Sequence, residues 1–309
     1  MNRDLQMSRK ICSDIGGDGI MKRKMVKRMA LAAAGMAAIS LTACGGTKGV
    51  SSAKGEEPIP ASEAFGQEGV WFYSDSAAAK DEKVDSVMIF DGKGNVTTYK
   101  TDITYSDLQG LSEKEIVELA KEQDQTVFKT DMQDFAESAE KSKEKAEEEK
   151  EDLDSRMEEI QQALVDYPEE YETINADRED LQQEIDKIQQ EIDNYDELLV
   201  RIPQAAYQEP DAQPFTLKLE TDQTGNNTAS ETLVYSCRSG LNADVSEADG
   251  DSWQPYRETE EEIELYPGLG VQEVYDMRFQ GFGTLVLMTG EDHPGFSLDT
   301  PDARGVEVD

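Results

Sequence analysis

Cysteine and histidine offer the most versatile side-chain chemistry, and the 309-residue chain contains only three cysteines and one histidine. The thiols are those of Cys12, Cys44 and Cys237, and His293 is followed by a proline and a glycine. A single histidine excludes a metal site built on a histidine pair and leaves no second base for a catalytic triad. We therefore expect His293 to be an ordinary surface-loop residue.

Other signatures of catalysis are also missing from the sequence. It contains no Walker loop, dinucleotide glycine signature, CxxC pair or nucleophile elbow. Paired carboxylates are abundant, but no pair stands out as a general acid and base. The sequence thus predicts a non-enzymatic protein without a cofactor or metal, although its acidity leaves weak Ca²⁺ binding open.

Cys44 follows a segment with the pattern of an export signal. Residues 21–28 carry five positive charges, and residues 29–43 form an apolar run of 15 residues. A basic region followed by a short apolar run is typical of a secretory signal. Because a helix needs about 20 apolar residues to cross the bilayer core, a permanent transmembrane helix is disfavoured. Residues 1–20 precede a signal that is already complete from Met21, which favours a start codon there.

The sequence Leu41-Thr42-Ala43-Cys44 resembles the lipobox of bacterial lipoprotein precursors, and the resemblance covers about the first 45 residues. It implies cleavage between Ala43 and Cys44, lipid attachment to the Cys44 thiol, and anchoring on the extracytoplasmic face of the cell membrane. Two acyl chains hold a protein stably on a membrane, whereas one holds it only marginally. The alternative is an ordinary cleaved signal that happens to precede a cysteine.

Removal of Cys12 and acylation of Cys44 would leave Cys237 as the only thiol. No internal disulfide could then form, and the fold would depend on its hydrophobic core. Cys237 ends a strand-like run, so we expect a small buried hydrophobic residue; a reactive thiol is the less favoured alternative.

The charge balance restricts the partners. Acidic residues outnumber basic ones 67 to 30, and the net charge of −37 includes +5 from residues 1–43, so the chain from Cys44 onward carries −42. Such a surface repels nucleic-acid backbones and anionic lipid headgroups. The sequence therefore predicts no nucleic-acid partner and favours polycations, basic peptides or divalent cations over anions.

Short runs of β-branched and aromatic residues predict strands on both sides of a long helical region. Residues 70–73, 84–90 and 96–101 are expected to form three strands, with a hairpin turn at the glycine-rich residues 91–95. Past residue 203 the strand pattern resumes. The expected strands there are residues 215–219, 232–236, 263–265, 274–279, 284–288 and 296–298.

The helical region has a clear start and a long heptad pattern. Ser112 and Glu115 form a capping box that predicts a helix start. From Met132 to Leu199, alternating spacings of three and four select twenty positions, of which only Lys143, Lys150 and Arg178 are not apolar. This spacing predicts a coiled coil.

Pro168 interrupts the heptad pattern and is expected to start a second helix, since proline suits the first helical position. Helices over residues 131–166 and 168–200 would then fold back as an antiparallel hairpin. The competing model is one kinked helix that pairs with a second chain, which leaves the oligomeric state open. In the hairpin, Tyr167, Pro168 and Tyr171 form an aromatic tip that could bind a partner or simply pack the hairpin end.

These elements predict an α+β fold: an antiparallel β sandwich or barrel with an inserted, long antiparallel coiled-coil hairpin. The expected segments are residues 1–43 for the upstream extension and signal peptide, 44–66 for a lipid-anchored flexible linker, 67–110 for the first β segment, 111–202 for the helical arm, and 203–309 for the second β segment.

A membrane-anchored lipoprotein that binds a protein or envelope partner is the favoured function. Membrane fusion proteins similarly insert a coiled-coil hairpin into a β domain, which implies an adaptor of an export or efflux complex as the alternative, although the flanking sequences lack the paired half-motifs of a lipoyl domain. A hydrolase of envelope or carbohydrate substrates is less favoured, because no acid/base pair can be named.

Overall fold

The computed structural model describes residues 57–239, 245, 248, 250, 253–267 and 270–308. The expected signal peptide, the cleavage site at Ala43 and Cys44, and most of the expected linker lie outside these residues. Among the helices that are described, none is both long and apolar enough to cross a membrane.

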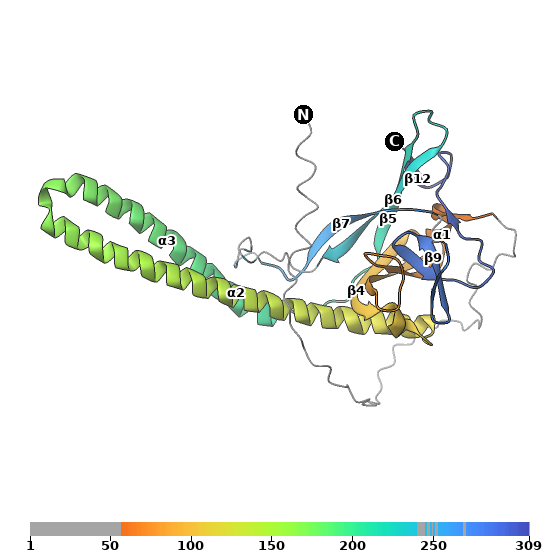
Figure 1. Ribbon diagram of the computed structural model, residues 1–309, viewed down its shortest axis with the longest axis horizontal. Helices are drawn as coiled ribbons and strands as arrows, with labels where there is room; N and C mark the ends of the chain where they lie inside the picture. The colour runs from red at the N-terminus through yellow and green to blue at the C-terminus, as the bar shows by residue number, and fades with distance from the viewer. Residues whose placement is uncertain are drawn as a thin grey trace, which may run out of the picture. The chain divides into compact units, whose positions relative to one another are not determined.

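A large, mainly antiparallel sheet joins strands from both sides of the helical region (Figure 1). Its order is β7-β6-β5-β4-β3-β2-β10-β9-β8, and β12 pairs with β5 in parallel. The first group of strands is β2 (Glu68–Tyr73), β3 (Lys83–Asp91) and β4 (Asn95–Thr104). The later strands of this sheet are β5 (Gln213–Thr221), β6 (Thr228–Ser239), β7 (Arg257–Glu264), β8 (Gln272–Val274), β9 (Met277–Phe282), β10 (Leu285–Met288) and β12 (Val306–Val308). Strand β11 (Phe296–Ser297) lies in a separate two-stranded sheet.

The predicted turn between β3 and β4 is confirmed. Gly92 and Gly94 adopt φ of 65° and 91°, which only glycine adopts readily. Asp91 accepts hydrogen bonds from the backbone N–H of Lys93 at 2.7 Å and of Asn95 at 3.0 Å. The aspartate therefore closes the turn that sets the register of the hairpin.

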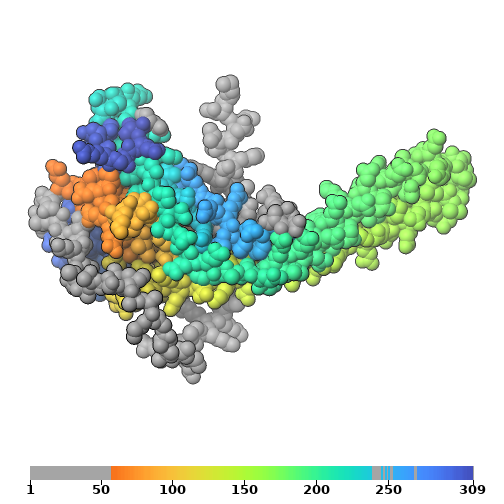
Figure 2. All heavy atoms as spheres, turned by 180° about the vertical axis from the view of Figure 1, so that it is seen from behind, coloured from red at the N-terminus to blue at the C-terminus, as the bar shows by residue number. Residues whose placement is uncertain are grey.

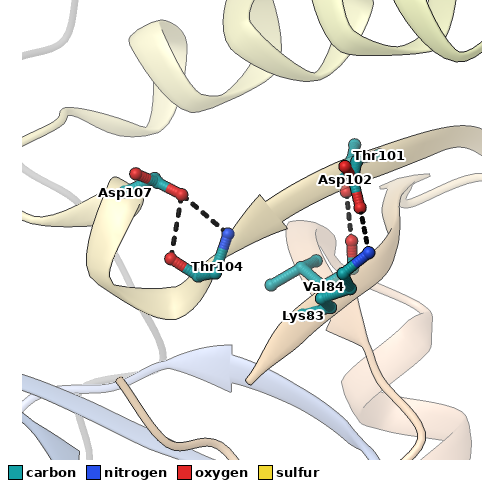
Figure 3. Close-up of polar contacts among 6 residues, drawn as sticks. All are labelled: Lys83, Val84, Thr101, Asp102, Thr104 and Asp107. Atoms are coloured by element: carbon teal, nitrogen blue, oxygen red, sulfur yellow. Dashed lines mark hydrogen bonds and ion pairs between the residues drawn. The ribbon is translucent and has the colours of Figure 1, made fainter. Parts of the chain in front are cut away.

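Further along this hairpin, β4 contains a bulge that a threonine stabilises. Val84 pairs with Ile103 but Ser86 pairs with Lys100, so β4 has one extra residue at this point. The buried Thr101 hydroxyl donates a hydrogen bond to the carbonyl of Val84 (Figure 3). It thereby gives a backbone carbonyl beside the bulge a buried hydrogen-bond donor.

Polar contacts also fix the strand ends beside this bulge. Lys83 forms an ion pair with Asp102 across the two strands (Figure 3). Thr104, at the end of β4, donates from its N–H and its hydroxyl to Asp107, each at 2.8 Å. This capping box starts a short 3₁₀ helix, Tyr105–Leu108, which leads to the long helix.

The sheet separates two hydrophobic cores, because alternate residues of a strand point to opposite faces. Trp71 of β2 and Phe90 of β3 lie in the inner core, which they share with Leu217 and Leu233 of β5 and β6. Phe72 of β2 lies in the helix-facing core on the other side. Further members of the helix-facing core are Val87, Tyr99, Tyr105, Leu108, Ile116, Ala120 and Phe279.

The end of the expected linker is folded, which corrects the predicted boundary at residue 66. Ile59–Pro60 forms β1, which pairs with β11, and Ala61–Phe65 forms the short helix α1. Phe65 is fully buried in the inner core, where its ring centroid lies 4.8 Å from those of Trp71 and Phe90. The segment was expected to be a linker because it has few large apolar residues, and the five residues of α1 are too few for a helical period to stand out.

The helical region is a long antiparallel hairpin (Figures 1 and 2). Helix α2 runs from Glu113 to Asp166, and the predicted capping box is present: Ser112 accepts from Glu115 N–H, and Glu115 accepts from Ser112 N–H. Helix α3 (Tyr171–Arg201) packs back along α2, so the hairpin is confirmed over the kinked single helix. The separate helices expected near residues 112 and 131 are one continuous α2.

Two other expectations need correction. The strand expected at residues 274–279 is two strands, β8 and β9, because Tyr275 adopts φ of 55° and turns the chain between them. The described strands do not close into a barrel, since the order of the sheet ends at β7 and β8. What the structure shows is a mixed fold with a large antiparallel sheet and a helical hairpin.

The bulge contact predicts a difference between two threonines of β4. In Thr101→Val the Val84 carbonyl loses its hydrogen bond in a buried place, and we expect the free energy of unfolding to fall by about 1–3 kcal/mol. Thr98→Val is the matched control, because its buried hydroxyl has no hydrogen-bond partner among the described residues. Urea denaturation would measure both variants, and equal losses would contradict this role for Thr101.

Candidate functional site

The free end of the hairpin is an exposed turn that contains the three predicted tip residues (Figure 2). Tyr167 caps the end of α2, Pro168 opens a 3₁₀ turn, and Tyr171 starts α3. Val165, Tyr167 and Tyr171 are 73%, 54% and 56% exposed, so their apolar surfaces face solvent. The structure therefore brings the tip residues together without burying them in the hairpin.

Pro168 explains why the helix breaks at this point. Proline has no N–H to donate and clashes with the preceding helical turn, so α2 cannot continue through it. The N–H of Tyr167 donates to the Ala163 carbonyl at 2.9 Å and the N–H of Glu170 donates to the Tyr167 carbonyl at 3.0 Å. These two hydrogen bonds close the turn and start the return of the chain.

Between tip and sheet, the two helices meet along the predicted heptad positions. Leu153 and Met157 of α2 are buried against Leu181 and Ile185 of α3. Lys143, an exception to the apolar pattern, donates to Asp196 of α3 at 2.6 Å and also lies 3.5 Å from Glu147. The hydrogen bond to Asp196 raises the pKa of Lys143, so the lysine stays charged and links the helices.

Aromatic side chains hold the base of the hairpin. Phe128 of α2 stacks on Tyr256 with ring centroids 5.1 Å apart, and Phe135 stacks on Trp253 at 5.8 Å. These rings belong to a base cluster with Tyr195 and residues of both helices. Phe128 lies four residues before Met132, where the alternation of three and four selects Lys129, so the heptad pattern does not find Phe128, and no sequence signal pairs it with Tyr256.

A polar network surrounds this base cluster. The Tyr207 hydroxyl and the Lys100 backbone N–H both donate to Asp124 of α2 at 2.8 Å. The Tyr99 hydroxyl donates to Glu209 at 2.9 Å, and Glu209 also pairs with Lys121 at 2.9 Å. The network ties α2 to β4 and to the segment that precedes β5.

Burial raises the pKa values of several groups in this network. Desolvation raises the pKa of Asp124, even though its hydrogen bonds from Lys100 and Tyr207 act in the opposite direction. Desolvation and the neighbouring carboxylates raise the pKa values of Tyr99 and Tyr207. Both tyrosines therefore stay protonated and act as hydrogen-bond donors.

Arg238 of β6 also contacts residues at the base of the hairpin. Its guanidinium donates to the backbone carbonyls of Gln208 and Glu209 at 3.2 and 3.1 Å and lies 5.2 Å from the ring centroid of Tyr256. The neighbouring cavity has a volume of about 30 Å³. A water needs about 10–15 Å³ by this measure, so the cavity suits a few waters and not a typical organic ligand. It is lined by Thr98, Lys100, Asp124, Val127, Phe128, Asp131, Gln208, Pro210, Arg238 and Tyr256.

Cys237 and His293 are both partly buried. Cys237 Sγ lies 4.0 Å from the Thr259 hydroxyl, and burial raises the pKa of the thiol, which favours the unreactive protonated form. His293 Nδ1 accepts from Gly295 N–H at 3.0 Å, and its ring packs against Phe296. Burial lowers the pKa of His293, so it is a half-buried neutral residue where an ordinary surface loop position was expected.

One carboxyl pair that the sequence did not distinguish lies in the interior. Glu231 is fully buried beside Asp299, whose N–H donates to Glu231 Oε2 at 2.8 Å. Asp299 in turn accepts from the N–H and hydroxyl of Ser62 at 2.7 and 2.6 Å, which caps α1. The pair thus connects β6, the C-terminal segment and α1, which indicates a structural role.

The described residues bring no metal-ligand cluster together: no group of three or more histidine, cysteine, aspartate or glutamate side chains is placed to hold an ion. Of the predicted site residues, those at the tip lie in one turn. Ala43 and Cys44 lie outside the described part of the chain.

The buried pair predicts a pH-dependent stability. Desolvation raises the pKa of Glu231 from 4.5 to about 8; the hydrogen bond from the Asp299 backbone N–H acts in the opposite direction, and the Asp299 carboxyl adds to the rise. The folded chain therefore binds more protons than the unfolded chain between these values, and its stability falls as the pH rises through this range. Glu231→Gln mimics the protonated form, so we expect a smaller fall between about pH 5 and about pH 8.

Urea denaturation at several pH values would measure this dependence. Glu307→Gln is the control, because it removes an exposed carboxylate of β12. If Glu231→Gln keeps the same pH slope as the parent chain, the buried pair is not its source.

Comparison with known proteins adds no relative. No protein-family model, no curated protein and no solved structure matches the chain. What the chain does is therefore inferred from its own residues and geometry.

Proposed function

We propose that this chain is a lipid-anchored, extracytoplasmic lipoprotein whose coiled-coil arm binds a protein partner without catalysing a reaction. The observation that carries the proposal is the helical hairpin, which exposes two tyrosines at its free end while aromatic and polar contacts hold its base. An arm of this kind is suited to reach and hold another protein.

The anchor rests on the sequence of residues 21–45, where a basic region, a short apolar run and the Ala43-Cys44 junction occur in order. Because Ile59 and Pro60 already form β1, the proposed tether is residues 45–58 and not the longer segment to residue 66. Random-coil scaling for a tether of this length gives a span of about 20 Å. Such a tether would keep the sheet close to the lipid headgroups and leave the arm to reach further.

We also propose that the sheet bends so that its two halves pack face to face as a sandwich. Residues of β2 and β3 share the inner core with residues of β5, β6 and β7. Only two residue pairs, Asn95 with Pro214 and Val96 with Gln213, join β4 to β5. A short junction of this kind favours a bend between the halves.

A binding role is favoured over catalysis by the chemistry of the described residues. The thiol of Cys237 is held in its protonated form, the Glu231 and Asp299 pair is buried, and the cavity at the base is small. The insertion of the hairpin between strands of one sheet also favours the alternative role, an adaptor in an export or efflux complex.

The anchor can be tested by Cys44→Ser. We expect the parent chain to sediment with membranes at the mass of a processed lipoprotein, because the acyl chains provide the attachment. The variant should remain unlipidated and uncleaved, with a larger mass. Cell fractionation and mass spectrometry would measure both, and an identical membrane-bound mass for parent and variant would contradict the anchor.

The arm can be tested by shortening the hairpin. Replacing residues 150–189 with a short glycine-containing turn removes the tip and the contacts of Leu153, Met157, Leu181 and Ile185, but keeps the base cluster of Phe128 and Phe135. We expect the shortened chain to lose a partner that the parent captures from envelope extracts. Thermal unfolding would show that the sheet is still folded. Undiminished capture by a folded, shortened chain would refute the arm as the binding element.

A further inference from the structure

The hairpin tip combines exposed rings with a strongly negative surrounding. Residues 158–180 contain nine acidic side chains and one basic side chain, Arg178. The guanidinium of Arg178 already donates to Asn175 at 3.1 Å. The tip is therefore an aromatic surface within a field of carboxylates.

The backbone adds to this field. The last turn of α2 has no basic residue, so nothing offsets the negative end of the dipole of this 54-residue helix. The opposite, positive end of α3 is compensated by Glu169, Glu170 and Glu172. The negative end of α2 and the acidic side chains at the start of α3 therefore both attract cations to the tip.

We propose that the tip binds a cationic segment of a partner polypeptide, rich in arginine and lysine, and this inference rests on the proposed function of the arm. Arginine guanidinium groups stack on the faces of Tyr167 and Tyr171, which attract cations through their π electrons. The aliphatic stems of the basic side chains lie on Val165, which is 73% exposed. The surrounding carboxylates neutralise the remaining positive charge.

Charge argues against the other occupants. A second copy of the tip carries the same negative charge and is repelled, as is a surface of anionic lipid. A purely apolar partner would remove water from the surrounding carboxylates without offering them a hydrogen-bond donor. A basic segment is the partner that satisfies both the rings and the carboxylates.

The test uses the full-length chain and a fluorescently labelled arginine-rich peptide, with a glutamate-rich peptide of equal length as a negative probe. In the double variant Tyr167→Ser and Tyr171→Ser the rings are lost but the charge is unchanged. We expect its affinity for the arginine-rich peptide to fall roughly tenfold, as two exposed cation–π contacts would give. Fluorescence anisotropy would measure the affinity, and circular dichroism would verify the helices.

The matched control is Tyr275→Asn. Tyr275 is 59% exposed on the turn between β8 and β9, outside the hairpin, and asparagine tolerates its positive φ. We expect the control to bind the peptide like the parent. If the tip variant binds normally, or if the control loses as much affinity, the attraction belongs to the acidic surface in general and the inference is overturned.

The two proposals can fail separately. Normal peptide binding by the tip variant, together with partner loss on shortening the hairpin, overturns the cationic tip and leaves the arm in place. Weakened peptide binding by the tip variant, together with full partner capture by the shortened chain, supports the cationic tip and refutes the arm as the binding element for that partner.

Discussion

Aromatic stacking at the base of the hairpin is the interaction on which the position of the arm depends. The rings of Phe128 and Phe135 lie on α2, and those of Tyr256 and Trp253 lie on the segment before β7, far away in the sequence. Each pair buries a large apolar area, and ring pairs add to this area term. The stacked rings lie in one cluster with Tyr195 and Leu198 of α3, so this cluster holds the base of the hairpin against the segment before β7.

Hydrogen-bonded polar groups also join segments that are distant in the sequence. Asp124, Tyr207 and Glu209 join α2 to β4 and to the segment before β5, while Glu231 and Asp299 join β6 to α1 and the C-terminal segment. Buried polar groups are costly unless they have partners, so each network constrains which segments can meet. Both networks link parts of the chain that its sequence separates widely, and a chain that is expected to form no internal disulfide depends on such contacts.

The charge of the chain has different consequences in different places. On the surface of the hairpin, carboxylates keep the long helices hydrated, while heptad positions such as Leu153 and Leu181 form the apolar contact between them. At the tip they surround exposed tyrosines, where the same charge favours a basic partner. In the interior, Glu231 avoids the cost of a buried charge by holding a proton.

Local patterns in the sequence determined most of the elements: the capping box at Ser112, the heptad spacing to Leu199, the turn at Pro168 and the hairpin at residues 91–95. Each of these depends on neighbours within a few residues, so the sequence carries the information directly. The lipid anchor at Cys44 is also a local pattern, and it stays a prediction. Only the tertiary structure decided that residues 59–65 belong to the core, that Phe128 meets Tyr256, and that Glu231 lies beside Asp299. These contacts join distant segments, and their partners are selected by the packing of the whole fold, which no local period in the sequence records.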